Sequence, residues 1–370
     1  MRKQIFYPIT LLAIALSAST LHFASSAKSS RNSNLAQSKT NFVLAESERR
    51  NAATPQGINP KVVESEIIRL HYQINEIVPP NFQVEKVAEG FTFIEGPIWI
   101  PEGYLLFSDT VDNVIYKWTP DNKVSIFRHN SGYSGSDTSA FREAGSNGLT
   151  LDSQGRLTIN ELGNRRVTRL EADGQVTVMA DKYEGKKLNS PNDLVYKSDG
   201  SLYFTDPPFG LLKTFDDPNK ELPFSGVYRV ADGKVKLINR DLTGPNGLAF
   251  SHDEKHLYVG NWNVNQRVIM RYEIDADGNL SRGKVFFDMA DTPQDNQAPD
   301  GMKVDKKGNL YIAGPGGVWI VSPEGEHLGL IRVPELPANM AWGDSDGKTL
   351  YLTARSGLYR VRLNIPGVRP

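Results

Sequence analysis

Six oxygen-bearing side chains occupy the same place in six copies of a repeated pattern. In each copy the polar residue, usually followed by glycine, precedes an apolar stretch, a turn and a second short strand such as Leu202-Tyr203-Phe204. The six positions are Glu95, Asn147, Asn192, Asn246, Asp300 and Asn339. A single Asn-Gly pair is most simply a turn, but six aligned polar residues, two of them carboxylates, indicate a shared site.

Carboxylate and amide oxygens that meet at one point would form a hard, all-oxygen cation site. Such donors suit Ca²⁺ better than softer metals, although Zn²⁺, Mn²⁺ and Mg²⁺ stay open as alternatives. Thiolate ligands are excluded because the sequence contains no cysteine, and none of its 6 histidines falls on a repeated position. A purely structural plug of polar side chains is the remaining alternative.

The elements that must position these residues are short strands. After residue 83 the sequence consists of β-branched and aromatic runs separated by Asp-Gly turns. From Glu95 to Asn339 the pattern recurs roughly every 49 residues, the size of a four-stranded propeller blade. The sequence therefore predicts an all-β, six-bladed β-propeller over residues 83–370, with the first strands lining a central channel. Residues 83–88 are expected to supply the missing outer strand of the last blade and close the ring.

The residues before the propeller divide into three expected segments. A basic start, a short apolar run and small residues ending at Ala27 predict a signal peptide over residues 1–27, and hence export to the periplasm or secretion. An uncleaved membrane anchor is the alternative. Residues 28–60 are polar and predict a disordered linker. Apolar residues at helical spacing between Val62 and Ile77 predict a short helix within residues 61–82.

Charge and motif content exclude several classes of function. The 42 basic and 43 acidic residues nearly cancel, so neither nucleic acid nor a membrane surface is an expected partner. The sequence also holds no GxSxG, Walker or GxGxxG pattern, which removes support for serine hydrolase and nucleotide chemistry.

Several segments together resemble the gluconolactonase, regucalcin and luciferin-regenerating family of six-bladed propellers, over about residues 83–363. The segments that carry the resemblance are Glu95-Gly96-Pro97, Asn147-Gly148-Leu149-Thr150, Gly163-Asn164-Arg165-Arg166-Val167, Ser190-Pro191-Asn192-Asp193-Leu194, Phe204-Thr205-Asp206-Pro207-Pro208-Phe209-Gly210, Pro245-Asn246-Gly247-Leu248, Pro299-Asp300-Gly301-Met302 and Thr353-Ala354-Arg355. The gluconolactonase-like branch is the most similar, and one departure from it is Leu162, where that branch often carries histidine.

The resemblance implies a divalent metal held by Glu95, Asn246 and Asp300, with Asn192 as a further ligand or a contact to substrate. It also implies that Asp300 acts as general base to a water molecule or as nucleophile. The expected reaction is hydrolysis of a small sugar-acid lactone whose carbonyl is polarised by the metal. Phosphotriester or fluorophosphate hydrolysis at the same site, and a non-catalytic calcium-binding propeller, are the alternatives.

Four further residues are expected to contact the substrate. Asn147 and Asn339 belong to the ring of repeated positions. Glu161 and Asp206 each end a second strand, where the alternative is a turn residue or a support for the ring. Three long connections are expected to rim the pocket, namely residues 128–146, 207–225 and 288–298.

Overall fold

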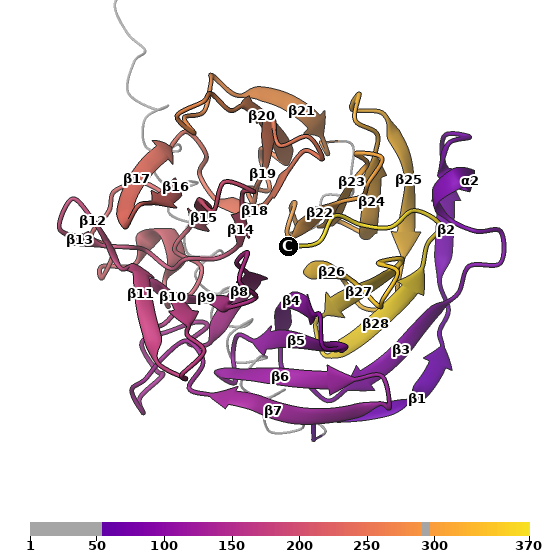
Figure 1. Ribbon diagram of the computed structural model, residues 1–370, viewed down its shortest axis with the longest axis horizontal. Coiled ribbons are helices and arrows are strands. Elements are labelled where there is room, and N and C mark those ends of the chain that lie inside the picture. The colour runs from indigo at the N-terminus through magenta and orange to yellow at the C-terminus, as the bar shows by residue number, and fades with distance from the viewer. Residues whose placement is uncertain (1–53, 291–296) are drawn as a thin grey trace, which may run out of the picture. The chain divides into compact units, whose positions relative to one another are not determined.

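A computed structural model describes residues 54–290 and 297–370, and its regular structure is almost entirely β-strand (Figure 1). Six antiparallel sheets are arranged around a central axis, each forming one blade with its first strand innermost. The six-bladed propeller predicted from the repeat is confirmed. The predicted signal peptide and most of the predicted linker lie outside the described residues.

Blades 1 to 4 each contain four strands that run outward in sequence order. Their strands are β4 (Ile94–Ile100), β5 (Tyr104–Asp109), β6 (Val114–Thr119) and β7 (Lys123–His129); β8 (Ser146–Leu151), β9 (Leu157–Glu161), β10 (Arg166–Leu170) and β11 (Val176–Ala180); β14 (Leu194–Tyr196), β15 (Leu202–Asp206), β16 (Gly226–Ala231) and β17 (Lys234–Asn239); and β18 (Pro245–Phe250), β19 (His256–Asn261), β20 (Val268–Glu273) and β21 (Lys284–Asp288). A small hairpin of β12 (Lys182–Tyr183) and β13 (Lys186–Lys187) and a 3-10 turn at Thr214–Asp216 lie in the connections.

Blades 5 and 6 each gain strands from the start of the described chain. Blade 5 comprises β22 (Met302–Val304), β23 (Leu310–Gly314), β24 (Gly317–Val321), β25 (His327–Arg332) and β2 (Glu66–Arg69), while blade 6 comprises β26 (Asn339–Gly343), β27 (Thr349–Ala354), β28 (Gly357–Arg362), β3 (Val84–Glu89) and β1 (Gln56–Val62). The antiparallel pairing of β3 with β28 aligns Ala88 with Leu358, which confirms the predicted closure of the ring.

The predictions for residues 54–82 need correction. The polar linker was expected to extend to residue 60, but Gln56–Val62 forms β1 on the outer edge of blade 6. The predicted helix is reduced to one turn, α2 (Ile74–Ile77), and Glu66–Arg69 forms β2 against β25. Exposed backbone groups of two sheet edges were available for pairing, and this tertiary pairing overrides the weak helical periodicity.

The apolar core lies between neighbouring blades. One cluster joins Ile98 and Ile115 of blade 1 to Leu149 and Ile159 of blade 2, all of them buried. Because alternate residues of a strand point to opposite faces, each sheet contributes one apolar face to the cluster on either side. The blades are thereby held at fixed angles about the axis, which fixes the positions of their first strands.

The described chain ends near the middle of the propeller (Figure 1). Asp300 precedes β22, whereas Val304 ends it, and the Val368 amide donates to the Val304 carbonyl at 2.9 Å. The Lys306 amide donates to the Pro366 carbonyl at 2.9 Å. Residues 366–369 therefore cross the far ends of the inner strands.

Candidate functional site

The six repeated polar residues lie at or just before the beginnings of the inner strands. Glu95, Asn147, Asn192, Asn246 and Asn339 are buried, with 2–4% of their surface exposed, and Asp300 keeps partial exposure. Strand pairing shifts register just after the ring positions in β4, β8 and β18. Such β-bulges redirect side chains toward the axis, so local backbone irregularity helps to form the ring.

Glycine after the polar residue allows neighbouring blades to approach closely. A Cβ atom on Gly301 would lie 2.1 Å from Cγ of Asn339, and one on Gly247 would lie 2.2 Å from the Asp300 carbonyl oxygen. The Gly148 amide also donates to the Asn192 carbonyl at 2.8 Å. The repeated glycine is therefore required for the inner strands to pack around a narrow channel.

The pKa values of the two ring carboxyls, Glu95 and Asp300, are both raised. Burial, together with the neighbouring charge of Asp193, raises the pKa of Glu95 to about 8, although the Gly96 amide donates to Oε2 at 2.9 Å. Burial and the charge of Glu95 raise the pKa of Asp300 well above its ordinary value, and the Asn246 amide partly offsets this. A bound cation would relieve both effects.

The donor set of the ring fits a hard cation. Within residues 54–290 and 297–370, no three Asp, Glu or His side chains gather closely enough to hold a metal by themselves, so amide oxygens have to complete any ligand set. Oδ1 of Asn147 is buried and has no hydrogen-bond partner, as expected of an oxygen that awaits a ligand or water. A site for Ca²⁺ or a similar ion is compatible with these donors, which are the carboxylates of Glu95 and Asp300 and the amide oxygens of Asn246 and Asn147.

Sequence reasoning missed three charged residues beside the ring. Asp193 directly follows Asn192 and replaces the usual glycine, which was a readable signal in the repeat. Glu143 comes from the long connection before β8, and its charge acts on both Glu95 and Asp300. Lys303 lies in β22; burial raises the pKa of Asp193, and the Lys303 charge offsets part of that rise. Neither Glu143 nor Lys303 occupies a repeated position.

Asn339, predicted to bind substrate, already contacts other groups of the protein through its side chain. Its Oδ1 accepts a hydrogen bond from the Met340 amide at 2.8 Å and lies 3.5 Å from Nζ of Lys303. Burial raises the pKa of the Glu95 and Asp193 carboxyls, from blades 1 and 3, and the nearby Asn339 amide partly offsets both shifts. Asn339 therefore joins side chains across the channel, and its geometry matches a support for the ring better than a contact to substrate.

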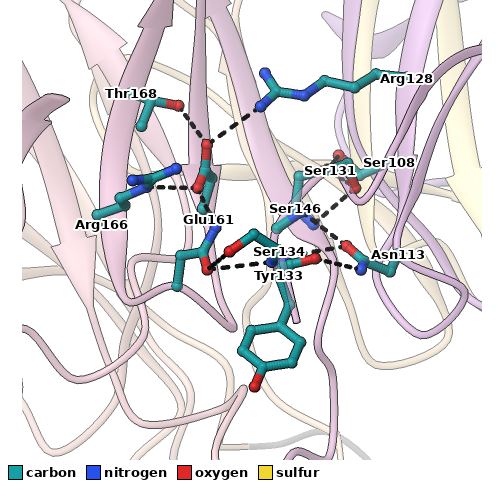
Figure 2. A network of polar contacts seen from close by, with 12 residues as sticks. Ser108, Asn113, Arg128, Ser131, Tyr133, Ser134, Ser146, Glu161, Arg166 and Thr168 are labelled. Carbon is teal, nitrogen blue, oxygen red and sulfur yellow. Dashed lines mark hydrogen bonds and ion pairs between the residues drawn. The ribbon is translucent and has the colours of Figure 1, made fainter. Parts of the chain in front are cut away.

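Glu161, the last residue of β9, lies in a polar network with Thr168, Arg166 and Arg128 (Figure 2). Its carboxylate accepts hydrogen bonds of 2.7 Å from Thr168, Arg166 and Asn164, and Arg128 lies 3.7 Å away. The side chain is fully buried, so every one of these contacts is internal to the protein. These contacts match the alternative role considered for Glu161, a support for the ring, rather than a contact to substrate.

Asp206 has a similar position at the end of β15. Its carboxylate accepts the backbone amides of Asn189 and Ser190 at 2.8 and 2.7 Å, and burial raises its pKa to about 7. Asn261 accepts the Gly244 amide at 3.1 Å in the same way. Residues that end second strands therefore hold the segments leading into the ring.

Two of the predicted rim connections meet at the mouth of the channel. Phe141 forms an isolated β-bridge with Leu211, and the Glu143 amide donates to the Gly210 carbonyl at 3.3 Å. Tyr133 packs on Phe141 with ring centroids 4.6 Å apart. Leu162, at the position where the gluconolactonase-like branch often carries histidine, is fully buried. The third connection, residues 288–298, lies partly outside the described residues.

A six-bladed propeller with a ring of carboxylates and amides on its axis defines a class of proteins built around a central polar site. The profile of the SMP-30/Gluconolactonase/LRE-like region matches residues 93–356, and the chain belongs to this family. It is 38% identical to a gluconolactonase of Zymomonas mobilis over 309 residues, which is 80% of this chain and 85% of that protein.

Solved structures show the same relationship. A gluconolactonase from Xanthomonas campestris superposes with a TM-score of 0.72 at 30% identity, over 83% of this chain and 98% of that one. A calcium-binding protein, regucalcin, from Agrobacterium tumefaciens shares the fold with a TM-score of 0.61 at 19% identity, over 76% of this chain and 93% of that one. None of the helices in the described part of the chain is long and apolar enough to cross a membrane.

Proposed function

We propose that this protein is a lactonase that hydrolyses a small sugar-acid lactone similar to gluconolactone. The observation that carries this proposal is the pair of acids formed by the buried Glu95 and the partly buried Asp300 at the beginnings of inner strands, in a chain 38% identical to a gluconolactonase. The fold alone would not be sufficient, because propellers support many functions. The proposal names no protein or nucleic-acid partner.

The ring is proposed to hold one divalent cation through Glu95, Asn246 and Asp300, with Asn192 as a further ligand or a substrate contact. Ca²⁺ is the first choice because all of these donors are oxygens, and Zn²⁺, Mn²⁺ and Mg²⁺ are the alternatives. When bound, the cation would supply Lewis acidity that polarises the lactone carbonyl and stabilises the oxyanion.

The chain's own residues account for the remaining steps. One carboxylate oxygen of Asp300 accepts a proton from the attacking water, and the water oxygen forms the new bond to the carbonyl carbon. The bond between the carbonyl carbon and the ester oxygen of the lactone then breaks, Asp300 returns its proton to that departing oxygen, and the hydroxy acid is released. Glu95, held by the Gly96 amide and by Asn339, keeps its carboxylate fixed beside Asp300.

A pH-stat assay of the chelator-treated protein tests the function. Aldonolactones, aromatic esters and phosphotriesters are offered separately, with Ca²⁺, Zn²⁺, Mn²⁺ or Mg²⁺ restored in turn. We expect acid release from aldonolactones that depends on an added cation. Preferential turnover of phosphotriesters would replace the lactonase assignment. Cation binding without turnover of any substrate would instead favour a calcium-binding propeller that is not an enzyme.

Export is also proposed, on the basis of the basic and apolar start of the sequence. Mass spectrometry of the protein expressed from its full reading frame is the test. A mature chain that begins at Lys28 would support secretion or a periplasmic location. An intact N-terminus on a membrane-associated chain would favour the uncleaved anchor.

A further inference from the structure

A lysine side chain lies beside the acidic ring, in contact with Asn339. Lys303 follows Asp300 by three residues on the inner strand of blade 5 and is partly buried. Its Nζ donates to the Met302 carbonyl at 3.0 Å and lies 3.5 Å from Oδ1 of Asn339. The ammonium group is therefore fixed by hydrogen bonds and directed toward blade 6.

Lys303 is connected to the ring through Asn339. The Asn339 oxygen faces Lys303 and the Met340 amide, and the same amide group lies close enough to Glu95 and Asp193 to offset part of the rise in their pKa that burial causes. This chain of contacts joins four blades. The Lys303 charge also acts directly on Asp193, whose Oδ2 is buried without a hydrogen-bond partner.

Among the described residues, Arg142 and Lys303 are the positive charges found to act on the nearby acids. Glu143 pairs with Arg142 at 3.4 Å, but the Arg142 side chain is 48% exposed and its charge is screened by water. Lys303, in contrast, lies among buried groups, where a charge acts at a low effective dielectric constant. It is the cation positioned to offset the acids before any ligand binds.

We propose that Lys303 is a built-in counter-charge of the ring, a positioning residue that holds Asn339 and Glu95 and weakens the affinity of the site for divalent cations. The second part rests on the cation site proposed above. A fixed positive charge repels an entering cation, but it also keeps the cation-free ring from being driven apart by its own carboxylates. The site thereby stays assembled and exchanges its ion more readily.

Three variants of Lys303 separate charge from shape. Lys303→Gln removes the charge and keeps a hydrogen-bond donor, Lys303→Met removes both, and Lys303→Arg keeps the charge. Lys306→Met is the matched control, because Lys306 is exposed and lies at the opposite end of the channel.

The first measurement is calorimetric titration of each chelator-treated, full-length variant with Ca²⁺ and with Mn²⁺ at constant ionic strength. We expect Kd to fall about tenfold in Lys303→Gln and Lys303→Met, as the loss of one unit of nearby charge predicts. Lys303→Arg and Lys306→Met should keep the Kd of the original protein. Equal Kd values for Lys303→Gln and Lys306→Met would overturn the proposed effect on affinity.

The second measurement needs no bound cation. In EDTA, the Tm of Lys303→Gln should be several degrees below that of Lys306→Met. The Tm of Lys303→Arg should lie close to that of Lys306→Met. Saturating Ca²⁺ should reduce the difference in Tm between Lys303→Gln and Lys306→Met. Equal Tm values for Lys303→Gln and Lys306→Met in EDTA would overturn the proposal that the Lys303 charge stabilises the cation-free ring. If the original protein binds neither cation, the cation site fails by itself, and melting in EDTA still decides the role of Lys303.

Discussion

At the scale of single residues, the site is defined by two carboxyls held where their charges are costly. Burial raises the pKa of both Glu95 and Asp300, and neutral amides, those of Gly96, Asn339 and Asn246, provide partial compensation. Such perturbed acids at the centre of a cleft or channel are typical of functional sites. The same arrangement explains why replacing one acid should affect chemistry more than folding.

Replacing Asp300 by asparagine should reduce kcat for the lactone by roughly 100-fold or more, because the variant loses the proton acceptor for water. The fold should persist, since the change removes a buried charge. Initial rates in the pH-stat assay and thermal melting provide the two measurements. Asp277→Asn, in an exposed turn, is the control and should keep full activity. An Asp300→Asn variant with most of its kcat would exclude Asp300 as the base.

At the scale of elements, residues at the ends of second strands position the ring from outside it. Asp206 holds the amides before β14, and Asn261 holds the Gly244 amide before β18. In blade 2, the Glu161 carboxylate accepts hydrogen bonds from Arg166 and Thr168 (Figure 2). Repeat alignment identified these positions from the sequence. It could not tell substrate contacts from internal ones, because that distinction depends on which neighbouring loop each carboxylate meets.

The buried Asp206 should give the protein a characteristic pH dependence of stability. Its pKa is about 7 in the folded chain, above its ordinary value of 3.8, so the folded state favours the protonated form. Its contribution is therefore complete below about pH 4 and is lost as pH rises to 7, by a few kcal/mol. Thermal melting from pH 4 to 8 should show a weaker decline in Asp206→Asn than in the original protein. Asp173→Asn, on an exposed turn, should keep the original slope, and equal slopes in all three would contradict the assignment.

Glycine at position 301 should be necessary for the contact between blades 5 and 6. A Cβ there would overlap the Asn339 side chain, so Gly301→Ala should cost about 2–3 kcal/mol through overpacking and disturb the ring. Urea denaturation measures the loss. Gly185→Ala is the comparison, because its Cβ would meet no atom within 4 Å and only its positive φ opposes the change. A smaller loss at Gly301 than at Gly185 would show that the contact is easily relaxed.

At the scale of the whole molecule, the repeat length and the ring could be predicted from sequence because both arise from local patterns that recur. The role of residues 83–88 as closing strand also followed from counting strands, and the structure places that strand at Val84–Glu89. The strands Gln56–Val62 and Glu66–Arg69 could not be foreseen from local pattern, since both depend on sheet edges. Glu66–Arg69 pairs with β25, about 260 residues later in the chain, and Gln56–Val62 pairs with the outer edge of β3, which itself joins β28. Lys303 and Glu143 were missed for the same reason, because their neighbours come from other blades.

Truncation should distinguish the two outer strands of blade 6. Deleting residues 1–63 removes β1 but leaves β3 paired with β28, so we expect a folded protein with full activity and a modestly lower Tm. Deleting residues 1–90 removes β2, α2 and β3 as well and exposes the edges of both β25 and β28, so we expect loss of cooperative folding or aggregation. Circular dichroism and thermal melting test both chains. Similar stability of the two deletions would mean that β3 is not needed for closure.

The pairing of β3 with β28 also has a kinetic consequence. The first four blades are built from strands that are close in sequence, whereas the sixth requires Val84–Glu89 to meet Gly357–Arg362. Loop closure over this distance is entropically slow, and β28 shows an open edge until it happens. The last step of folding should therefore be the joining of this one sheet, and aggregation should compete with it most strongly at that stage.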